Sequence, residues 1–306
     1  MRKSILLSLV VCCLLAFQTP GFGEDAPDPE QLVAEHVKAI GAPELLAKIK
    51  AVTFVGDAEV NFIQGMHGHM QGVAMVVSEG ANIAVMLKFG DVNYPGEYFA
   101  FDGKDVTVGH IKPGLKSPIA DFLFRYNKMM KQGIVGGVFS NAWPLLDVQN
   151  HPKARMKAGK DKVDKVELYS LEYQPEDWYG NMKIRMYFEP ETFRHVRTEY
   201  KVRTDNDMTT GFNPDNPSGG LMSADEENPA NDMLIGRVKG ESYYTLVEKF
   251  EDFKKVGALT LPHRYVLHYT IDGTAQSGFI ADWTLSARQI GFNAQNIDPK
   301  VFQAEK

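Results

Sequence analysis

The chain has 306 residues, of which 44% are hydrophobic and 24% are charged, and its formal net charge is −6. These values are typical of a soluble globular protein and exclude a disordered, collagen-like or polytopic membrane chain. A negative net charge also argues against broad electrostatic binding of nucleic acid or of an anionic membrane.

Residues 1–23 predict a secretory signal peptide. Arg2 and Lys3 form a basic start, an apolar stretch follows from Ile5 to Phe17, and Gly21 and Gly23 flank a small-x-small cleavage site. The apolar stretch is short for a bilayer-spanning helix. The mature protein is therefore expected to start near residue 24.

The two cysteines of the chain, Cys12 and Cys13, lie inside this apolar stretch. A lipid-attachment site at either cysteine is the alternative, but Val11 and Cys12 stand where such a site has a small residue. An exported chain whose mature part lacks cysteine is typical of a periplasmic protein without disulfides. We expect a periplasmic location and no lipid anchor.

The first predicted element is a helical region over residues 28–52. Asp28 is a good N-cap, Pro29 suits the first helical position, and apolar residues then recur at helical spacing. Gly41 interrupts the pattern, and Pro43 restarts it as a second, short helix.

From Thr53 the hydrophobic period changes from 3.6 to 2, which predicts antiparallel strands. The expected strands cover residues 53–62, 71–78, 82–89, 97–101, 165–173, 182–188, 194–202, 242–253, 261–271 and 276–287. Residues 205–232 have no periodicity and are rich in Asn, Asp, Pro and Gly, so we expect a flexible insertion there. The fold class is α+β, with a single domain over residues 24–306.

One segment, residues 115–147, differs from the strands around it. Its first part has apolar residues at helical spacing between Pro118 and Gln132, and its second part, from Gly133 to Leu146, is apolar and glycine-rich. Gly136 and Gly137 could serve as a backbone hinge, which predicts a helical lid. The alternative is a buried connector packed under the helix.

Five strings of residues, in order along the mature chain, carry a family resemblance. They are AEHVKAIGAPELLAKIKAVTFVGDAEV, YFAFDGKDV, YFEPETFRHVRTEY, FEDFKKVGALTLPHRYVLHY and FNAQNIDPKVFQ. Together they resemble the LolA/LolB-like periplasmic carriers and the outer membrane lipoprotein-sorting proteins. The resemblance implies an antiparallel sheet curled into an unclosed β-barrel, whose mouth is covered by helices and whose apolar cavity accepts acyl chains.

Methionine and aromatic side chains suit an apolar ligand, because unbranched thioethers and rings repack around chains of varying length. We expect the helical lid to act as a gate whose inner side chains an acyl chain can replace. The alternative for each residue is ordinary core packing. The expected ligand contacts are Phe54, Phe62, Met75, Met86, Phe122, Leu123, Tyr126, Met129, Met130, Phe139, Trp143, Met182 and Met186.

Metal and cofactor sites are not predicted. His67 and His69 lie one residue apart among glycines, and neither they nor His263 and His268 have a third ligand at a characteristic spacing. The other histidines considered, His110, His151 and His195, are interpreted as surface residues.

No catalytic motif is found either. The chain lacks a nucleophile elbow, a P-loop, a dinucleotide fingerprint and an HExxH helix. Glu97 and Asp102 form a carboxylate pair that no spacing rule supports, so we interpret them as solvated surface charges. The chain is therefore not expected to be an enzyme.

These observations predict a monomeric periplasmic binding or carrier protein. Its ligand would be a lipid, an acylated lipoprotein or another long apolar molecule, and its partners would be a lipoprotein cargo and a membrane-bound donor or acceptor. The alternative is an envelope sensor or interaction module of the same fold without transport. Nucleic acid is not an expected partner.

Overall fold

The computed structural model describes residues 26–66, 68–209, 237–273 and 278–304. The predicted signal peptide and most of the predicted insertion lie outside these ranges, as does His67. None of the helices within the described ranges combines the length and the apolarity needed to span a bilayer.

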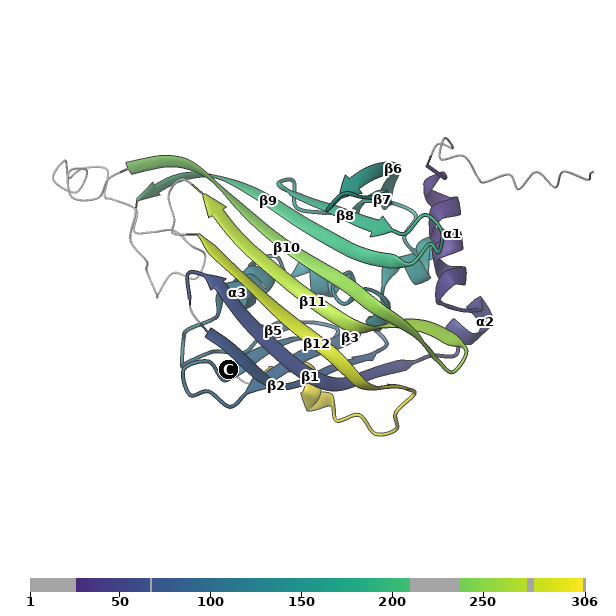
Figure 1. Cartoon of the computed structure of the whole chain (residues 1–306), viewed down its shortest axis with the longest axis horizontal. Coiled ribbons are helices and arrows are strands. Elements are labelled where there is room, and N and C mark those ends of the chain that lie inside the picture. The colour runs from purple at the N-terminus through teal and green to yellow at the C-terminus, as the bar shows by residue number, and fades with distance from the viewer. Residues whose placement is uncertain (1–25, 67, 210–236, 274–277, 305–306) are drawn as a thin grey trace, which may run out of the picture.

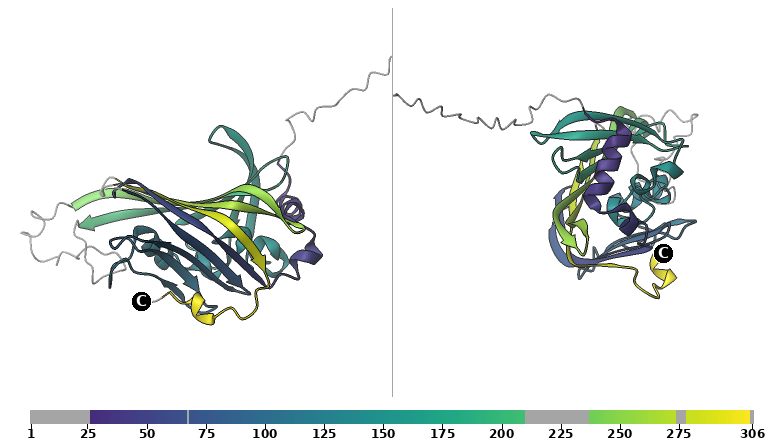
Figure 2. Two further views of the ribbon diagram at one scale, coloured as in Figure 1. Left: turned by 60° about the horizontal axis from the view of Figure 1, so that its bottom comes forward. Right: turned by 90° about the vertical axis from the view of Figure 1, so that its right-hand side faces the viewer.

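Twelve strands form one antiparallel sheet in the order β5-β4-β3-β2-β1-β12-β11-β10-β9-β8-β7-β6. The two edge strands do not pair with each other, and the sheet curls into the predicted unclosed barrel (Figures 1 and 2). The strands are β1 (Ala51–Gln64), β2 (Gly68–Glu79), β3 (Asn82–Phe89), β4 (Gly96–Phe101), β5 (Val106–Val108), β6 (Arg155–Val163), β7 (Val166–Gln174), β8 (Met182–Phe188), β9 (His195–Thr209), β10 (Arg237–Val256), β11 (Leu259–Gly273) and β12 (Phe279–Phe292).

The centre of the sheet joins the two ends of the chain, because β1 pairs with β2 on one side and with β12 on the other. Two meanders, β1–β5 and β6–β12, become one sheet through this pairing. The β1–β12 register shifts between Val55 and Gly56. A Cβ at residue 56 would lie 1.9 Å from the carbonyl oxygen of Ser286, so the close approach of the two strands requires glycine.

One face of the sheet is apolar and concave. In β1, Phe54, Val60 and Phe62 are buried while Asp57 and Glu59 are exposed, which is the predicted two-residue alternation. The concave face packs against the helical segments in one continuous hydrophobic core (Figure 2).

The two strands that the sequence analysis missed are the edges of the sheet. β5 has only three residues, too few for its alternation to predict a strand, and no side chain of β6 is fully buried. The insertion predicted from residue 205 is also wrong for residues 205–209, which continue β9 and pair with β10. Backbone hydrogen bonds to β10 form this part of the strand. The pattern of side chains in a sequence gives no information about such bonds.

Two helices, α1 (Pro29–Ile40) and α2 (Pro43–Leu46), cover one end of the concave face (Figure 1). The Asp28 carboxylate accepts a 2.9 Å hydrogen bond from the Gln31 amide, which is the predicted N-cap of α1. The two helices are separated at Gly41, as predicted. α2 ends at Leu46 and β1 begins at Ala51, so the helical region is shorter than the predicted residues 28–52.

The segment between β5 and β6 crosses the concave face in short helical turns. They are α3 (Pro118–Arg125), α4 (Lys128–Lys131) and three 3-10 turns, η1 (Gly137–Phe139), η2 (Pro144–Leu146) and η3 (Val148–Asn150). The helix predicted over residues 118–132 is broken after Arg125. Its predicted inner face is at most 2% exposed at Ile119, Phe122, Leu123, Met129 and Met130.

The second half of this segment, from Gly133 to Leu146, is also packed into the core. Gly136 and Gly137 are both buried, and a Cβ on Gly137 would lie 2.7 Å from the Phe250 ring. Phe139 and Trp143 are also at most 1% exposed. A closed lid and a buried connector would both be packed in this way, so the lid stays a prediction beside its alternative.

The convex face carries a second, smaller apolar cluster. A C-terminal turn, η4 (Pro299–Phe302), places Phe302 against Val77, Ala84 and Ala100. The Tyr98 hydroxyl fixes this turn by donating a 2.7 Å hydrogen bond to the carbonyl oxygen of Val301. Strands β2 to β4 are therefore apolar on both faces.

Replacing Phe122 with Asp should unfold the protein or lower its melting temperature by roughly 10 °C or more. Loss of a buried Phe side chain costs about 3–5 kcal/mol, and the new carboxylate would lie unpaired in the core. The matched control is Phe124→Asp on the same helix, because the Phe124 side chain is 38% exposed. Circular dichroism melting of both variants measures the effect. A Phe122→Asp protein as stable as the control would contradict core packing of α3 and favour its interpretation as a lid.

Candidate functional site

A hollow of about 1120 Å³ lies at the end of the concave face that α1 and α2 cover. Its walls come from these helices, from the 3-10 turns η1 to η3 and from the neighbouring ends of β1, β6, β11 and β12. Most of the lining is apolar: Val33, Val37, Ile40, Leu46, Ile49, Val52, Val138, Leu145, Leu146, Val148, Met156, Leu259, Leu261 and Phe292.

The charged residues of the lining are balanced in sign. Glu30 and Asp147 are acidic, Lys38 and Lys50 are basic, and all four are exposed. The Lys38 ammonium is 2.7 Å from the Glu35 carboxylate, so part of this charge is already paired. The hollow therefore offers an apolar interior with a nearly neutral charged rim.

None of the residues predicted to contact a ligand lines this hollow. Eleven of the thirteen belong to the main core or pack against it: Phe54, Phe62, Phe122, Leu123, Tyr126, Met129, Met130, Phe139, Trp143, Met182 and Met186. Met75 and Met86 are the exceptions, because they lie opposite each other on β2 and β3 and pack on the convex face beside Phe302. They do not share a site with the other eleven.

The sequence did contain a signal for the hollow. The apolar positions of α1 form a broader stripe than contact with the sheet requires, and Leu46 and Ile49 extend it. The sequence analysis assigns no ligand contact to these helices, so it does not predict their lining residues.

Two buried carboxylates bind the two ends of residues 117–136, the part of the crossing segment that contains α3 and α4. At its start, Glu97 accepts hydrogen bonds from the Tyr94 hydroxyl and, at 2.8 Å, from the hydroxyl of Ser117, the N-cap residue of α3. The indole of Trp283 donates in turn to the Tyr94 hydroxyl at 2.6 Å. Glu97 is only 4% exposed, which corrects its interpretation as a surface charge.

At the other end, Glu248 on β10 accepts a 2.7 Å hydrogen bond from the backbone amide of Gly136. Its carboxylate also accepts from the hydroxyls of Tyr200 and Tyr265. The expected hinge glycine is thus tied to three strands of the sheet through one side chain, with Gly136 itself in the left-handed region at φ 89°.

Burial is the largest cause of the raised pKa of both carboxyl groups, Glu97 and Glu248. It raises the pKa of Glu97 to about 7, although the bonds from Tyr94 and Ser117 oppose the shift. It raises the pKa of Glu248 as well, against the bonds from Tyr265, Tyr200 and Gly136. Tyr, Ser and backbone donors satisfy these carboxyl groups in place of a cation.

A cluster of rings fastens α1 to the sheet. The Nδ1 atom of His36 lies 2.8 Å from the carbonyl oxygen of Phe193. The His36 ring contacts Trp143 and His195, with centroid distances of 5.2 and 6.0 Å. His195 is only 3% exposed, so its interpretation as a surface residue was wrong. Burial lowers the pKa of His36 to about 4 and also lowers that of His195.

The other histidines form no metal site within the described ranges. His69 lies 2.7 Å from the Glu59 carboxylate, and His268 lies 2.5 Å from the Asp282 carboxylate. Each pair joins neighbouring strands on the outer face of the sheet.

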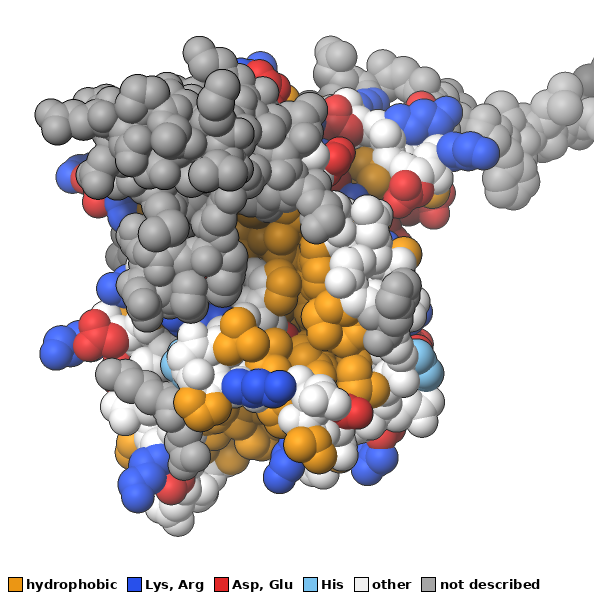
Figure 3. Space-filling view, turned by 90° about the vertical axis from the view of Figure 1, so that its left-hand side faces the viewer, with side chains coloured by type: hydrophobic (Ala, Val, Ile, Leu, Met, Phe, Trp, Pro, Cys, Tyr) orange, Lys and Arg blue, Asp and Glu red, His pale blue; other side chains and the backbone are white. Residues whose placement is uncertain are grey.

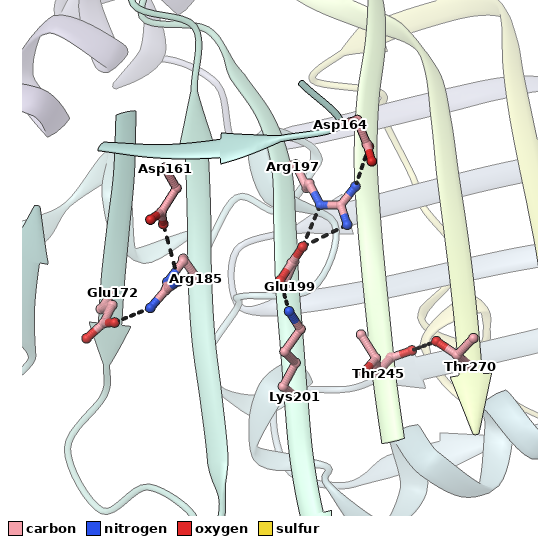
Figure 4. A network of polar contacts seen from close by, with 9 residues as sticks. All are labelled: Asp161, Asp164, Glu172, Arg185, Arg197, Glu199, Lys201, Thr245 and Thr270. Carbon is pink, nitrogen blue, oxygen red and sulfur yellow. Dashed lines mark hydrogen bonds and ion pairs between the residues drawn. The ribbon is translucent and has the colours of Figure 1, made fainter. Parts of the chain in front are cut away.

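Strands β6 to β9 carry charged networks on the outer face (Figure 4). Arg185 bridges Asp161 and Glu172, and Arg197 bridges Asp164 and Glu199. Lys201 adds a second contact to Glu199 at 2.6 Å. Because these charges are mutually paired, this surface presents no large field of one sign.

The end of the molecule away from α1 also shows hydrophobic side chains, gathered in a depression (Figure 3). The hollow beside α1 is lined by residues that the structure describes, and it is the candidate site.

No protein-family model matches the chain, and no curated protein matches it. Among solved structures, it is similar to a domain described as an outer membrane lipoprotein-sorting protein from Vibrio parahaemolyticus, with 11% identity, coverage of 89% of this chain and 95% of that chain, and a TM-score of 0.43. It is also similar to the LolA superfamily protein NE2245 from Nitrosomonas europaea, with 14% identity, coverage of 91% and 98%, and a TM-score of 0.43. A DUF1329 family protein from Desulfovibrio piger gives 8% identity, coverage of 90% and 98%, and a TM-score of 0.39.

One of these structures is described as a LolA superfamily protein and one as an outer membrane lipoprotein-sorting domain. Likenesses this distant carry over neither a ligand nor a partner, because one fold serves many functions. The function must therefore be inferred from the chain's own geometry.

The buried histidine should make folding sensitive to acid. The folded state holds the pKa of His36 near 4, whereas the unfolded chain has the ordinary value of 6.5. The unfolded state therefore binds more protons between these values, and the contribution of His36 to stability falls as the pH falls from 6.5 to 4, by up to about 3 kcal/mol. In His36→Gln this contribution should be absent.

Urea unfolding of both proteins at several pH values from 8 to 4.5 measures the effect. Glu97 and Glu248 act in the opposite direction, because their raised pKa values favour the folded state as the pH falls. The difference between wild type and variant cancels the two carboxyl groups, which are common to both, and reports His36 together with the part of the lowered pKa of His195 that His36 causes. Parallel pH profiles for the two proteins would show that His36 does not titrate as its burial requires.

Proposed function

We propose that this chain binds a long apolar molecule in the hollow beside α1 and carries it as an exported, monomeric binding protein. The observation that supports the proposal is the size and lining of the hollow. Its volume of about 1120 Å³ exceeds the usual range of small-molecule pockets, roughly 300–1,000 Å³. Fourteen of its lining residues have large apolar side chains.

The chemistry of the lining favours an apolar ligand. Burying apolar surface gains roughly 25 cal/mol per Å². The charged side chains are exposed and balanced in sign, so they attract neither anions nor cations strongly. A lipid or an acyl chain fits this surface better than a sugar or a nucleotide does.

One wall of the hollow is weakly held, which gives a ligand a way in. α2 has four residues, none of them buried, and no side chain caps its start. The crossing segment, in contrast, is tied down by Glu97 and Glu248. Regions with few buried contacts open at lower free-energy cost than the core does. Entry and release are therefore expected beside α2 and the end of α1.

The family resemblance in the sequence implies acyl chains as cargo, and the signal-peptide pattern implies a periplasmic setting. A lipid or the acyl groups of a lipoprotein are accordingly the first ligands to test. A membrane-bound donor and an acceptor would complete a carrier cycle. In this proposal the ligand occupies the hollow. The eleven core residues pack behind the lining of the hollow and do not contact the ligand.

Val37→Asp should weaken binding of a fluorescent fatty acid by roughly tenfold or more, because a carboxylate would stand inside the apolar wall. Val37→Trp should weaken it comparably by filling the space without adding charge. The control is Val73→Asp on the convex face, where the side chain is 51% exposed. Fluorescence titration, with melting curves to confirm folding, measures all three variants. A wild-type protein that does not bind the probe, or equal affinities in all variants, would refute the proposal.

A further inference from the structure

The two edges of the sheet differ in how well they are protected. β5 has three residues, whereas β6 has nine, contains no proline and pairs with β7 without a register shift. Within the described residues, no backbone hydrogen bond joins β6 to a segment other than β7. Proteins usually shorten, bend or cover such an edge, because its free N–H and C=O groups can pair with another strand. β6 is therefore open to strand addition.

The turn between β6 and β7 shows which backbone groups of β6 point outward. Val163 pairs with Val166, and the two residues between them have φ values of 50° and 71°, as in a two-residue hairpin turn. The residues that flank such a turn are hydrogen-bonded to each other, and bonded pairs then alternate along an antiparallel ladder. The N–H groups that face away from β7 are therefore those of Met156, Ala158, Lys160 and Lys162.

The charged side chains of β6 are mostly basic. Four of its nine residues are Lys or Arg and only Asp161 is acidic, in a chain whose net charge is −6. The Asp161 carboxylate already lies 3.2 Å from the guanidinium of Arg185 (Figure 4). Outside these paired networks, Arg155, Lys157 and Lys162 are exposed and form no ion pair with any described residue. A strand added at this edge should therefore be acidic.

A second copy of the chain does not fit this edge. Two β6 strands side by side would bring their basic side chains together, and like charges on neighbouring strands repel each other. Lysine on an edge strand commonly prevents such self-association. An acidic segment would instead be attracted by the same charges while its backbone pairs with β6. A membrane surface would use the charges alone and leave the backbone groups unpaired.

The open edge lies beside the hollow. Figure 1 shows β6 at the margin of the sheet, on the side of α1. β6 begins at Arg155, and the residues on either side of it, Ala154 and Met156, belong to the lining of the hollow. A strand of nine residues is roughly 30 Å long. A segment bound along β6 would therefore start at the wall of the hollow and run away from it.

We propose that the outer edge of β6 binds an extended, acidic segment of a partner protein, which adds a strand to the sheet beside the hollow. In this mode of recognition, backbone hydrogen bonds supply affinity and side chains supply specificity. Here the specificity comes from Arg155, Lys157 and Lys162. The inference goes beyond the proposed function, because it concerns a polypeptide partner and needs no ligand in the hollow.

Three fluorescein-labelled peptides, each of four tripeptide repeats, test the edge with the full-length mature protein at low ionic strength. Glu-Thr-Thr repeats can form an acidic strand, with Glu on both of its faces, as the basic side chains of β6 are. Gln-Thr-Thr repeats lack the charge, and Glu-Pro-Pro repeats keep it but lack most of the N–H groups. Fluorescence anisotropy should show roughly tenfold tighter binding of the Glu-Thr-Thr peptide than of either control. Equal affinities of the Glu-Thr-Thr and Glu-Pro-Pro peptides would overturn strand addition.

Variants of the protein separate the charges from the backbone. Lys157→Glu reverses one charge of the edge and should weaken binding of the Glu-Thr-Thr peptide roughly fivefold. Its matched control is Lys88→Glu, an exposed lysine on β3 inside the sheet, which should change the affinity little. Ala158→Pro keeps every charge but removes an outward N–H, and should also weaken binding roughly fivefold. Equal effects of Lys157→Glu and Lys88→Glu would contradict the assignment of the surface to β6.

Hydrogen exchange covers the case in which Ala158→Pro unfolds the protein. In wild type, the bound Glu-Thr-Thr peptide should slow exchange roughly tenfold at the N–H groups that face away from β7, because the peptide would then accept their hydrogen bonds. These groups belong to Met156, Ala158, Lys160 and Lys162. A bound peptide that leaves their exchange unchanged would refute strand addition.

Phosphatidylglycerol vesicles provide the membrane arm of the test. A wild-type protein that binds none of the peptides, but binds these vesicles more tightly than Lys157→Glu does, would assign the edge to an anionic membrane and overturn the proposal. None of these measurements uses an apolar ligand. The strand-addition site and the proposed function can therefore fail independently of each other.

Discussion

A twelve-stranded antiparallel sheet that curls without closing leaves its concave face to be covered by the rest of the chain. Barrels solve this problem by closing around their own side chains, but here β5 and β6 stay apart. The cover has two pieces, α1 with α2, and the segment between β5 and β6 (Figure 2). The hollow lies at the seam between them, where short turns of irregular backbone meet a helix.

The two buried carboxylates decide which piece of the cover is fixed. Ser117 is bound to Glu97 and Gly136 to Glu248, so both ends of the α3 segment are tied to the sheet. Apolar side chains in place of these groups could give equal stability, but they would not select one backbone position. The carboxylates select it because each oxygen needs particular donors in place. The part of the cover from Ser117 to Gly136 is thereby held in one position on the sheet.

The sequence predicted the elements of this fold well and the faces of its strands less well. The two-residue period located ten strands, and Asp28 with Pro29 located the start of α1. Met75 and Met86 were assigned to the wrong face because η4 makes β2 to β4 apolar on both sides, which leaves the pattern without a preferred side. The burial of Glu97 and His195 depends on partners distant in sequence, such as Ser117 and His36, and no local pattern contains that information.

The seam between the two cover pieces brings different physical requirements together. α1 must stay attached for the core to remain closed, and His36 attaches it through a neutral ring bonded to Phe193. The same ring meets the indole of Trp143 edge to face at 5.2 Å, inside the core. A side chain that served only to fasten the helix could be apolar, as Leu32 and Ile40 are. A histidine at this position adds the hydrogen bond from Nδ1 to the Phe193 carbonyl oxygen, which an apolar side chain cannot make, and so fixes how α1 lies on the sheet.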